Sequence, residues 1–486
     1  MKLTTLLSHT AQLIGFIHKS GMPSDTVASN YFRSKKYIGS KERRFISELV
    51  FLALRNKYLC DYCFDKAFLV INDYSDVSEP QNEKQDFGCV LTAFYMSSKF
   101  TIDNNFNADT LFAALPEQKD GSLNDSIKNS VCEFFEISPE SADNFINRVD
   151  KIFPDLENDI STKIEGSNFN DEFFSLLEVR YSMKSWIIKQ LMSYVGKDGL
   201  TELLTSLNQS AQLTVRLNTI NNTRDDFVKY LNSIDIPSEK CNLSPSGIKI
   251  LKRVQLSQYD FFKNGIIEVQ DEGSQLISFA LAPVENSRIL DACAGAGGKT
   301  LHISSLTNDK SYIMAFDIDS RKLRELEYRA KKFGYKSIKT RTVRIKDISE
   351  NILVTKELYD YVLVDAPCSG TGTIRRSPMN KYKLNENLLQ RLKENQLRIL
   401  NYYSKFVADG GVLVYSTCSF MPQENQEVVK EFLDSNTDFE PCPLSDSFEK
   451  YSIEISGLGK DDYFINLLPS VHGTDGFFIA KMRRKS

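Results

Sequence analysis

Apolar residues recur at helical spacing through the first part of the chain. The clearest case is segment 43–64, where a stripe with a period near 3.6 is formed by Phe45, Ile46, Leu49, Val50, Leu52, Leu54 and Leu59. Further helices are predicted within Cys89–Phe153 and from around Trp186 to about Leu207. The polar stretch Glu157–Asp171 is interpreted as a connector. The pattern therefore predicts an all-helical N-terminal part.

The pattern changes to short, mixed signals after this helical part. Residues Gln212–Thr219 alternate as a strand, and Thr223 is placed to cap a following helix. Residues 247–254 (GIKILKRV) again alternate as a strand. These segments predict a small α+β module that ends near Lys263.

From Asn264 onward, strand and helix signals alternate. Helices are predicted to start near Gly298, Ser320, Asn385 and Gln423, and Gly410 is expected to end the third of them. Such alternation predicts a mostly parallel sheet with helices on both faces. The predicted strands are Arg288–Cys293, Tyr312–Ile318, Ser337–Val343, Tyr359–Ala366, Gly411–Thr417 and Phe477–Met482.

These three patterns predict a multi-domain fold. An all-α N-terminal domain is expected at 1–165, and linker helices with the small α+β module at 166–263. An α/β domain of the Rossmann-like type is expected at 264–486.

Composition narrows the class of protein. No apolar run approaches the ~20 residues that a membrane helix needs. The nine cysteines are odd in number and scattered, which fits a reducing compartment, so a cytoplasmic protein without membrane association is expected. Cys60 and Cys63 form a C-x-x-C pair, but no second pair follows. The pair is therefore interpreted as part of a buried helix face, with zinc as the less favoured alternative, and no metal is expected.

The charge is distributed unevenly. The formal net charge is -4, yet Arg321–Lys346 contains eleven Lys or Arg residues and only two Glu residues. A solvated helix face and a phosphate-binding surface are both compatible with such a run. It is retained as a candidate contact for nucleic acid.

Residues Arg288–Thr300 (RILDACAGAGGKT) predict a strand, a turn of small residues and a helix start. A phosphate-binding P-loop requires Gly where Cys293 stands, and a dinucleotide fingerprint requires Gly where Thr300 stands. The pattern that fits is D-x-x-x-G-x-G, in which the glycines let backbone approach a nucleoside and the acid can meet an amino group. The candidate cofactor residues of this loop are Asp291, Ala292, Cys293, Ala294, Gly295, Ala296 and Gly297.

Two further acids follow the next strands. Asp317 ends the second predicted strand, where a carboxylate can accept hydrogen bonds from ribose hydroxyls. Asp347 follows the third strand and could serve the adenine edge. Each acid alone is more often a helix cap or a solvated turn. Together, at the carboxyl ends of successive strands, the acids predict a site for S-adenosylmethionine.

Two cysteines follow the next strands, in Asp365-Ala366-Pro367-Cys368 and in Ser416-Thr417-Cys418. Ligands of open parallel sheets bind in the crevice beyond such strand ends. Carbon 5 of cytosine becomes nucleophilic only after a thiolate adds to carbon 6, which requires a cysteine close to the base. Asp365 is the candidate carboxyl group for protonation at ring nitrogen 3. The alternative is that the two cysteines have no chemical role and pack as small buried hydrophobic side chains.

The C-terminal motifs resemble RNA cytosine-5 methyltransferases of the Sun/NSUN type. They are VQDEGSQ (269–275), DACAGAGGKT (291–300), DAPCSGTGTIRRSP (365–378), YSTCS (415–419), PQEN (422–425) and HGTDGFFIAK (472–481). The resemblance implies that Cys418 is the nucleophile and that Cys368 is needed for release. It also implies that Lys299, Asp317, Arg321, Asp347 and Asp365, with the loop, surround cofactor and base. Arg375, Arg376 and Lys299 are implied as RNA contacts.

The upstream segments are similar to a bacterial member that modifies 16S ribosomal RNA. Residues 37–59 (YIGSKERRFISELVFLALRNKYL) resemble its NusB-like helical domain, which implies RNA or protein binding there. Two positions depart from the family: Ala296 stands where a proline is usual, and no tryptophan follows the RRSP motif. The second departure leaves open which base is contacted. Ribosomal RNA is the expected partner, and a monomer is assumed.

Two other functions remain as alternatives. Methyltransferases acting on amino nitrogen commonly carry Asn or Asp followed by Pro-Pro and an aromatic residue, whereas here Pro367 precedes Cys368. A catalytically idle RNA-binding or assembly factor would bind RNA without transferring a methyl group.

Overall fold

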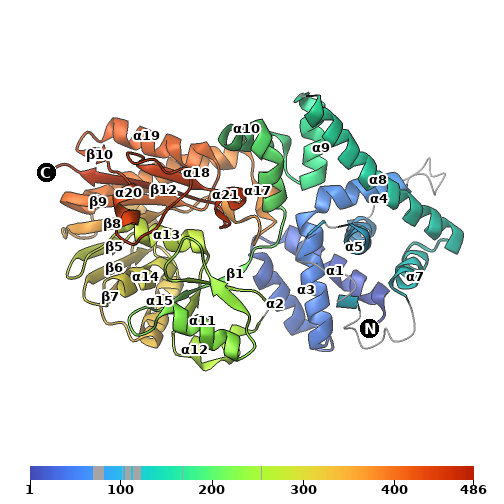
Figure 1. Cartoon of the computed structure of the whole chain (residues 1–486), viewed down its shortest axis with the longest axis horizontal. Coiled ribbons are helices and arrows are strands. Elements are labelled where there is room, and N and C mark those ends of the chain that lie inside the picture. Colours follow the sequence, from blue (N-terminus) through green and yellow to red (C-terminus); the bar gives the residue numbers. More distant parts are fainter. Residues whose placement is uncertain (69–81, 101, 104–110, 113–121, 167, 253) are drawn as a thin grey trace. The chain divides into compact units, whose positions relative to one another are not determined.

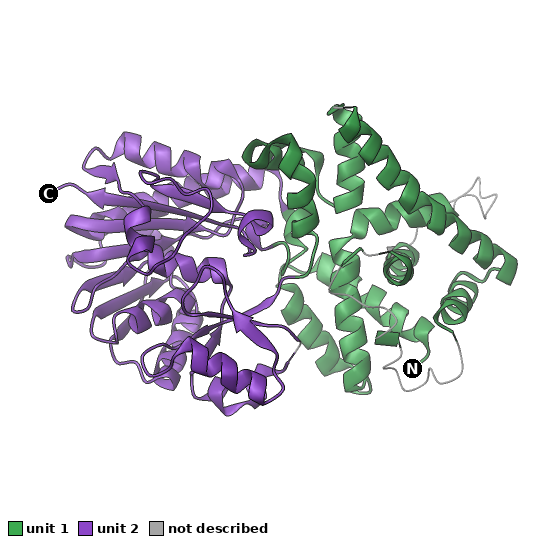
Figure 2. Cartoon of the chain, viewed as in Figure 1, with its two compact units in different colours: residues 1–210, 374–383 green, residues 211–373, 384–486 purple. Residues whose placement is uncertain are grey.

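The chain forms two compact units in the computed structural model, which describes residues 1–68, 82–100, 102–103, 111–112, 122–166, 168–252 and 254–486. The first unit comprises residues 1–210 and 374–383, and the second comprises 211–373 and 384–486 (Figure 2). The end of the motif DAPCSGTGTIRRSP (365–378) therefore folds with the helices of the first unit. The residue ranges of the three predicted domains stay predictions.

The described part of the first unit is helical, as expected. Its core forms where α1 packs on α3 and α5, and where α4 packs on α5 and α8. The buried side chains of α1 include Leu6, Leu13 and Ile17, at the spacing of one helix face. The helices are α1 (Leu3–Lys19), α2 (Ser24–Ser34), α3 (Ser40–Arg55), α4 (Lys57–Phe68), α5 (Asn82–Lys99), α7 (Leu123–Phe135), α8 (Pro139–Glu165), α9 (Asp171–Tyr181), α10 (Ser185–Leu207) and α17 (Asn380–Lys383).

The predicted connector at Glu157–Asp171 is wrong for most of its length. Helix α8 continues to Glu165, and only a few residues separate it from α9. The reason is that Phe153, Leu156 and Ile160 extend the buried stripe of the helix. The polar residues of this stretch form the exposed face of an amphipathic helix, which composition alone does not distinguish from a loop.

The interpretation of Cys60 and Cys63 as part of a buried helix face is confirmed. Both thiols lie on α4 with no exposed surface. Burial raises the pKa of the Cys63 thiol to about 12, as expected for a thiol held in an apolar core. These two cysteines therefore pack as small apolar side chains.

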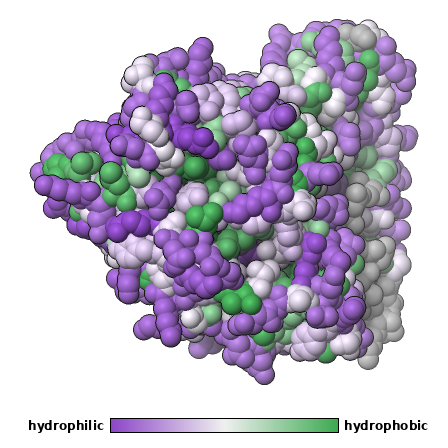
Figure 3. Space-filling model, turned by 60° about the vertical axis from the view of Figure 1, so that its left-hand side comes forward, coloured by the Kyte–Doolittle hydropathy of each residue, from purple (hydrophilic) through white to green (hydrophobic). Residues whose placement is uncertain are grey.

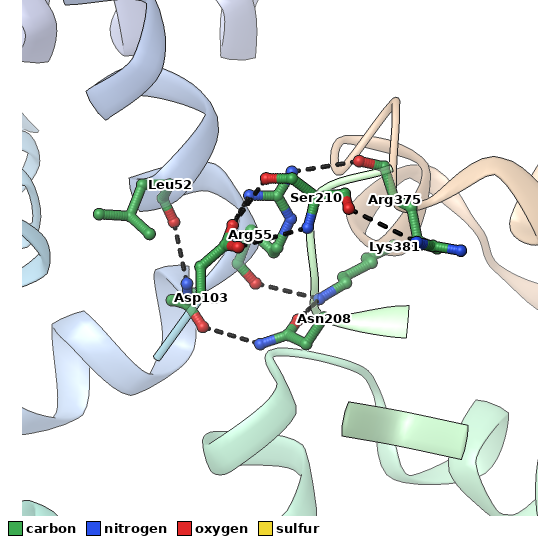
Figure 4. A network of polar contacts seen from close by, with 8 residues as sticks. Leu52, Arg55, Asp103, Asn208, Ser210, Arg375 and Lys381 are labelled. Atoms are coloured by element: carbon green, nitrogen blue, oxygen red, sulfur yellow. Dashed lines mark hydrogen bonds and ion pairs between the residues drawn. The ribbon is translucent and has the colours of Figure 1, made fainter. Parts of the chain in front are cut away.

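Residues 374–383 are held in the first unit by a buried polar network (Figure 4). Lys381 is 1% exposed, and its Nζ donates to the carbonyls of Arg55 (3.0 Å) and Tyr181 (2.8 Å) and to Asn208 Oδ1. Arg55 also pairs with Asp103 at 2.7 Å. Since Arg55 and Tyr181 end their helices, the lysine satisfies carbonyl groups that have no partner within the helix.

Replacing Lys381 with Met is expected to destabilise the first unit by about 3 kcal/mol, because buried acceptors lose their donor. Trp186 is the only tryptophan and lies on α10, so its fluorescence during urea unfolding reports this unit. Lys383→Met, at an exposed position of the same segment, is the matched control and should change stability by less than about 0.5 kcal/mol. Equal effects of the two variants would contradict the anchoring role of Lys381.

The small α+β module forms within the second unit, but its sheet continues past Lys263, where the module was expected to end, because β4 pairs with β1. Its strands are β1 (Leu213–Leu217), β2 (Ser238–Lys240), β3 (Gly247–Ile250) and β4 (Ile267–Val269), paired antiparallel in the order β2-β3-β1-β4. Helix α11 (Arg224–Ser233) starts after Thr223, whose side chain accepts a hydrogen bond from the Asp226 amide, as the predicted cap. Short helix α12 (Asp260–Lys263) precedes β4.

The main sheet of the second unit has the order β10-β12-β9-β8-β5-β6-β7, with β11 paired to β12. Strands β7, β6, β5, β8 and β9 run parallel, and β12 is antiparallel to β9. The chain order reverses between β5 and β8, which makes this the switch point of the sheet. The strands are β5 (Arg288–Asp291), β6 (Tyr312–Asp317), β7 (Ile338–Thr342), β8 (Tyr359–Asp365), β9 (Val407–Thr417), β10 (Phe439–Pro441), β11 (Phe464–Leu467) and β12 (Phe477–Arg484).

Helices cover both faces of this sheet, as predicted (Figure 1). Successive residues of one strand enter opposite cores: Ile289 packs on the face of α13 and α14, and Leu290 packs on the face of α18 and α19. The helices are α13 (Glu272–Leu281), α14 (Gly298–Leu306), α15 (Ser320–Phe333), α16 (Ile345–Ser349), α18 (Glu386–Tyr403), α19 (Gln426–Ser435), α20 (Ser445–Glu449) and α21 (Pro469–His472).

The predicted helix after Asn385 forms, and the Asn385 side chain caps it by accepting from the Leu388 amide. Its expected end at Gly410 is wrong. The helix ends at Tyr403, and Gly410 lies within β9 at a positive φ of 71°. The glycine is needed for a bend inside a strand rather than for a helix terminus.

The face drawn in Figure 3 is mainly hydrophilic, with hydrophobic residues in small separate groups. Scattered exposed apolar side chains of this kind are ordinary on a globular protein. A search of the described helices finds none with the length and apolarity needed to cross a membrane.

Candidate active site

A cavity of roughly 500 Å³ lies at the carboxyl ends of β5, β6, β8 and β9. This is the crevice that the strand order predicts for a ligand. Its lining residues are Gln270, Ser274, Asp291, Ala292, Cys293, Ala294, Gly295, Gly298, Lys299, Asp317, Ile318, Lys322, Ile348, Asp365, Ala366, Pro367, Cys368, Ile399, Tyr403 and Cys418. The volume is within the range of small-molecule sites.

The two predicted cysteines lie together at this cavity. The Sγ atoms of Cys368 and Cys418 are 3.3 Å apart, and each thiol is partly exposed. The contact with Cys418, burial and the charge of Glu424 together raise the pKa of Cys368 well above its ordinary value. Cys368 is therefore held as a protonated thiol next to Cys418.

Asp291 lines the cavity, and one of its two carboxylate oxygens is buried without a hydrogen-bond partner among the described residues. Its Oδ2 accepts from Thr300 Oγ1 at 2.6 Å, whereas Oδ1 has no hydrogen-bond partner among the residues that the structure describes. Burial raises the pKa of Asp291 to about 7, and nearby Asp365 adds to the shift. A cationic ligand group placed at Oδ1 would satisfy this oxygen and favour the ionised form.

Asp317 is oriented by the backbone around it. Its Oδ2 accepts from the Gly295 amide and its Oδ1 from the Asp319 amide, both at 2.8 Å. Gly297 has a φ of 88°, and an added Cβ would lie 2.1 Å from Leu326 Cδ1. The glycine thus allows the loop to lie against α15 and brings Gly295 to the end of β6.

Lys299 and Asp365 form an ion pair across the cavity. The Lys299 Nζ lies 2.5 Å from Asp365 Oδ2, and Ser416 Oγ donates to Asp365 Oδ1 at 2.9 Å. Burial alone lowers the pKa of Lys299, but the charge and hydrogen bond of Asp365 outweigh it, so the pKa is raised. A fixed ammonium group and a fixed carboxylate therefore lie beside the thiols.

The cavity does not include every predicted site residue. Ala296 and Gly297 belong to the loop without lining the cavity, and Arg321 pairs with Asp319 instead. Asp347 is buried at the start of α16, where its carboxylate accepts from Arg344. The remaining loop residues, Ala292, Cys293, Ala294 and Gly295, do line it.

The predicted RNA contacts Arg375 and Arg376 lie in the segment that folds with the helical unit. Both side chains are partly buried. The Arg375 guanidinium donates to the Ser210 carbonyl at 3.5 Å, and the Arg375 carbonyl accepts from Arg55 at 3.1 Å. Figure 4 shows Arg375 within this network.

Sequence reasoning missed residues that support the cofactor loop from the α+β module. Arg216 of β1 is 1% exposed and donates to the Gly298 carbonyl at 2.7 Å. Arg329 of α15 donates to the Ala296 carbonyl and pairs with Glu268 of β4 at 2.9 Å. The alternating pattern places Arg216 at a polar position of its strand. An exposed arginine would stand at the same position, so the sequence does not indicate that Arg216 is buried.

The residues present fit S-adenosylmethionine. The unsatisfied Asp291 Oδ1 suits an ammonium group, and Asp317 suits hydroxyl donors. Ile318, Ile348, Ile399 and Tyr403 provide an apolar wall for a flat ring. Of these four, Ile318 and Ile348 adjoin the predicted site residues Asp317 and Asp347 in sequence.

Known proteins are similar to this chain in sequence. A family model described as 16S rRNA methyltransferase RsmB/F matches residues 278–483, and one for an RsmF/B-like ferredoxin-like domain matches 183–257. The probable ribosomal RNA small subunit methyltransferase B of Bacillus subtilis is 34% identical over 309 residues, which span 64% of this chain and 68% of the relative.

Two solved structures are also similar. The crystal structure of PH0851 covers 100% of this chain and 99% of its own, with a TM-score of 0.69 and 22% identity, which shows the shared fold. A methyltransferase homolog protein from Pyrococcus horikoshii covers 63% of this chain and 97% of its own, with a TM-score of 0.53 and 28% identity.

Proposed function

Because the chain belongs to the RsmB/F family of 16S rRNA methyltransferases, which use S-adenosylmethionine, we propose that it methylates carbon 5 of a cytosine in 16S ribosomal RNA. The observation that carries the proposal is the pair of thiols 3.3 Å apart at the edge of the cavity. Transfer to an amino nitrogen needs no thiol, whereas transfer to carbon 5 needs one.

In this proposal Cys418 is the nucleophile. Its thiolate adds to carbon 6 of the cytosine, and the ring electrons move so that carbon 5 becomes nucleophilic. Asp365 faces the cavity and is proposed to hold a proton at ring nitrogen 3, with Lys299 fixing its position. When bound, S-adenosylmethionine supplies the methyl group that carbon 5 takes up.

Cys368 is proposed to assist product release. Once carbon 5 carries the methyl group, solvent takes its proton and the electrons of that C–H bond form the double bond between carbons 5 and 6. The bond between Cys418 sulfur and carbon 6 breaks, the sulfur leaves with the electron pair of this bond, and the ring regains its aromaticity. The departing sulfur carries negative charge, and the Cys368 thiol is close enough to donate a hydrogen bond to it. The raised pKa of Cys368 keeps this proton in place at neutral pH.

RNA is proposed to be captured by charge and to present an unpaired cytosine. The solvent-facing side of α15 carries Arg321, Arg324 and Lys331, while Leu323, Leu326 and Ala330 face the core. Tyr328 lies on the exposed side and is 71% exposed. Cations beside an exposed aromatic ring suit phosphates and a stacked base. Arg375 and Arg376 remain predicted contacts.

The direct test uses labelled S-adenosylmethionine and 16S rRNA from cells that lack this protein. After incubation, the RNA is digested to nucleosides and the product is identified by mass spectrometry. The expected product is 5-methylcytidine. N4-methylcytidine would support amino-group methylation instead, and RNA binding with no transfer would indicate an assembly factor.

The affinity for S-adenosylmethionine should depend on pH through Asp291. Its pKa of about 7 means that the carboxyl group is protonated below neutrality, and binding of a cation favours the ionised form. Affinity is therefore expected to rise by up to roughly tenfold per pH unit between pH 5.5 and 7, and to level off above. Calorimetric titrations across this range measure the slope.

Asp291→Asn is the matched control, since it keeps the shape of the side chain and removes its charge. The variant should bind more weakly and lose the slope. A wild-type affinity that does not change with pH, or an unchanged slope in the variant, would contradict the role of Asp291.

A further inference from the structure

A buried carboxylate lies beneath the two cysteines. Glu424 belongs to the PQEN motif, follows β9 in a short turn, and has no exposed surface. It does not line the cavity, so it has no direct access to a bound substrate. In the proposed chemistry of Cys418, Cys368 and Asp365 it takes part only through its charge, which helps to raise the pKa of Cys368.

Both cysteine-bearing turns bind this one carboxylate. Its Oε1 accepts from the Ser369 amide at 2.8 Å, next to Cys368 in the chain. Its Oε2 accepts from the hydroxyls of Ser369 and Ser419, and Ser419 is next to Cys418. The two serine hydroxyls also lie 3.1 Å from each other.

A third element joins the same group. Gln396 of α18 donates through Nε2 to Glu424 Oε1 at 2.9 Å and to the Pro367 carbonyl at 3.0 Å. Four donors thus converge on two oxygens, a set that a carboxylate can accept and a protonated carboxyl group cannot accept in full. The low dielectric of a buried site strengthens each of these bonds.

The turns also meet through backbone that leaves no room for side chains. The Gly372 amide donates to the Cys418 carbonyl at 2.9 Å, and the Gly476 amide donates to the Gly372 carbonyl at 2.8 Å. A Cβ on Gly372 would lie 2.1 Å from the Gly476 carbonyl oxygen. These backbone contacts hold Gly372 against the Cys418 carbonyl and Gly476. Glu424 instead binds Ser369 and Ser419, the residues next to the two cysteines.

We propose that Glu424 is a positioning residue that fixes the separation of Cys368 and Cys418 by binding the turns that carry them. The proposal rests on the proposed roles of the two cysteines. It assigns to the glutamate of PQEN a task in catalysis without contact with the substrate.

The test measures the spacing of the thiols directly, apart from methyl transfer. The full-length protein is equilibrated with mixtures of glutathione and glutathione disulfide, and the Cys368–Cys418 disulfide is quantified by peptide mapping. In this exchange, one glutathione disulfide oxidises the two thiols and yields two glutathione molecules. The effective concentration of the pair follows from the equilibrium ratio.

Glu424→Ala is expected to lower this effective concentration by roughly tenfold to a hundredfold, because a displacement near 1 Å has effects of that size. Glu424→Gln keeps an acceptor for the Ser369 amide, and the serine hydroxyls can reverse to accept from its amide group. It should therefore remain close to the wild type. The matched control is Glu427→Ala, because Glu427 is an exposed residue of α19 that pairs with Lys393. This variant should leave the effective concentration of the two thiols unchanged.

Affinity for S-adenosylmethionine shows whether the alanine variant is folded. If that variant does not fold, Ser369→Ala removes only the hydroxyl contact and should lower the effective concentration to a smaller extent. An effective concentration unchanged in both Glu424→Ala and Ser369→Ala would overturn the proposal.

The methyl-transfer arm separates this proposal from the proposed function. If the proposed function and the positioning role of Glu424 are both correct, kcat for methyl transfer falls in Glu424→Ala while the affinity for S-adenosylmethionine is retained. If Cys418 proves dispensable for transfer, the proposed function fails, yet a lowered effective concentration in Glu424→Ala would still support the positioning role.

Discussion

Replacing Cys418 with Ala is expected to abolish methyl transfer to RNA, with a loss of at least about four orders of magnitude in kcat. Without the thiolate, carbon 6 receives no nucleophile and carbon 5 stays unreactive toward a sulfonium. The cavity itself should persist, because Asp291, Asp317 and the loop between them do not depend on this thiol. Transfer of labelled methyl groups to 16S rRNA measures the loss.

Two controls accompany this prediction. Affinity for S-adenosylmethionine should be unchanged in Cys418→Ala, which separates loss of chemistry from loss of the site. Cys132→Ala, at a partly buried cysteine of α7 in the helical unit, should keep full activity. Substantial transfer by Cys418→Ala would remove the basis of the covalent mechanism.

The fold was largely predictable because its signals are local. Strands β5, β6 and β8 lie within a residue or two of their predicted limits, since each is a short apolar run bounded by turn residues. Thr223 and Asn385 cap helices as predicted, because capping depends on one side chain and the next three amides. The two errors concern residues that suit two structures. The polar residues of α8 suit either a loop or an exposed helix face, and Gly410 suits either a helix terminus or a positive φ within a strand.

The candidate site was predictable to the extent that residues follow strands. Asp291, Asp317, Asp365, Cys368 and Cys418 meet because the carboxyl ends of parallel strands share one edge. Asp347 and Arg321 also follow strands, but each pairs with a nearby charge and does not line the cavity. Sequence position alone does not reveal which neighbouring charge a flexible side chain will bind.

The supporting residues required the three-dimensional structure. Arg216 lies more than eighty residues from the Gly298 carbonyl that it binds, and Glu424 joins turns that are fifty residues apart. Such long-range polar contacts have no period in the sequence. Their burial was also unexpected, because Arg and Glu are almost never fully buried unless paired.

Replacing Cys368 with Ala is expected to make a covalent complex of protein and RNA accumulate, from undetectable to a large fraction of the enzyme. Cys418 can still attack and carbon 5 can still be methylated, but the departing sulfur loses the thiol that lies 3.3 Å away. Release then becomes the slowest step, and the linked species builds up. Denaturing electrophoresis with labelled RNA detects it.

The double variant Cys368→Ala, Cys418→Ala decides which sulfur forms the bond. It should form no complex, because the attacking thiol is gone. A complex in the single variant Cys418→Ala would instead assign attack to Cys368 and reverse the two roles. That outcome is unexpected, because the resemblance of the YSTCS motif to Sun/NSUN-type enzymes implies that Cys418 is the attacking residue.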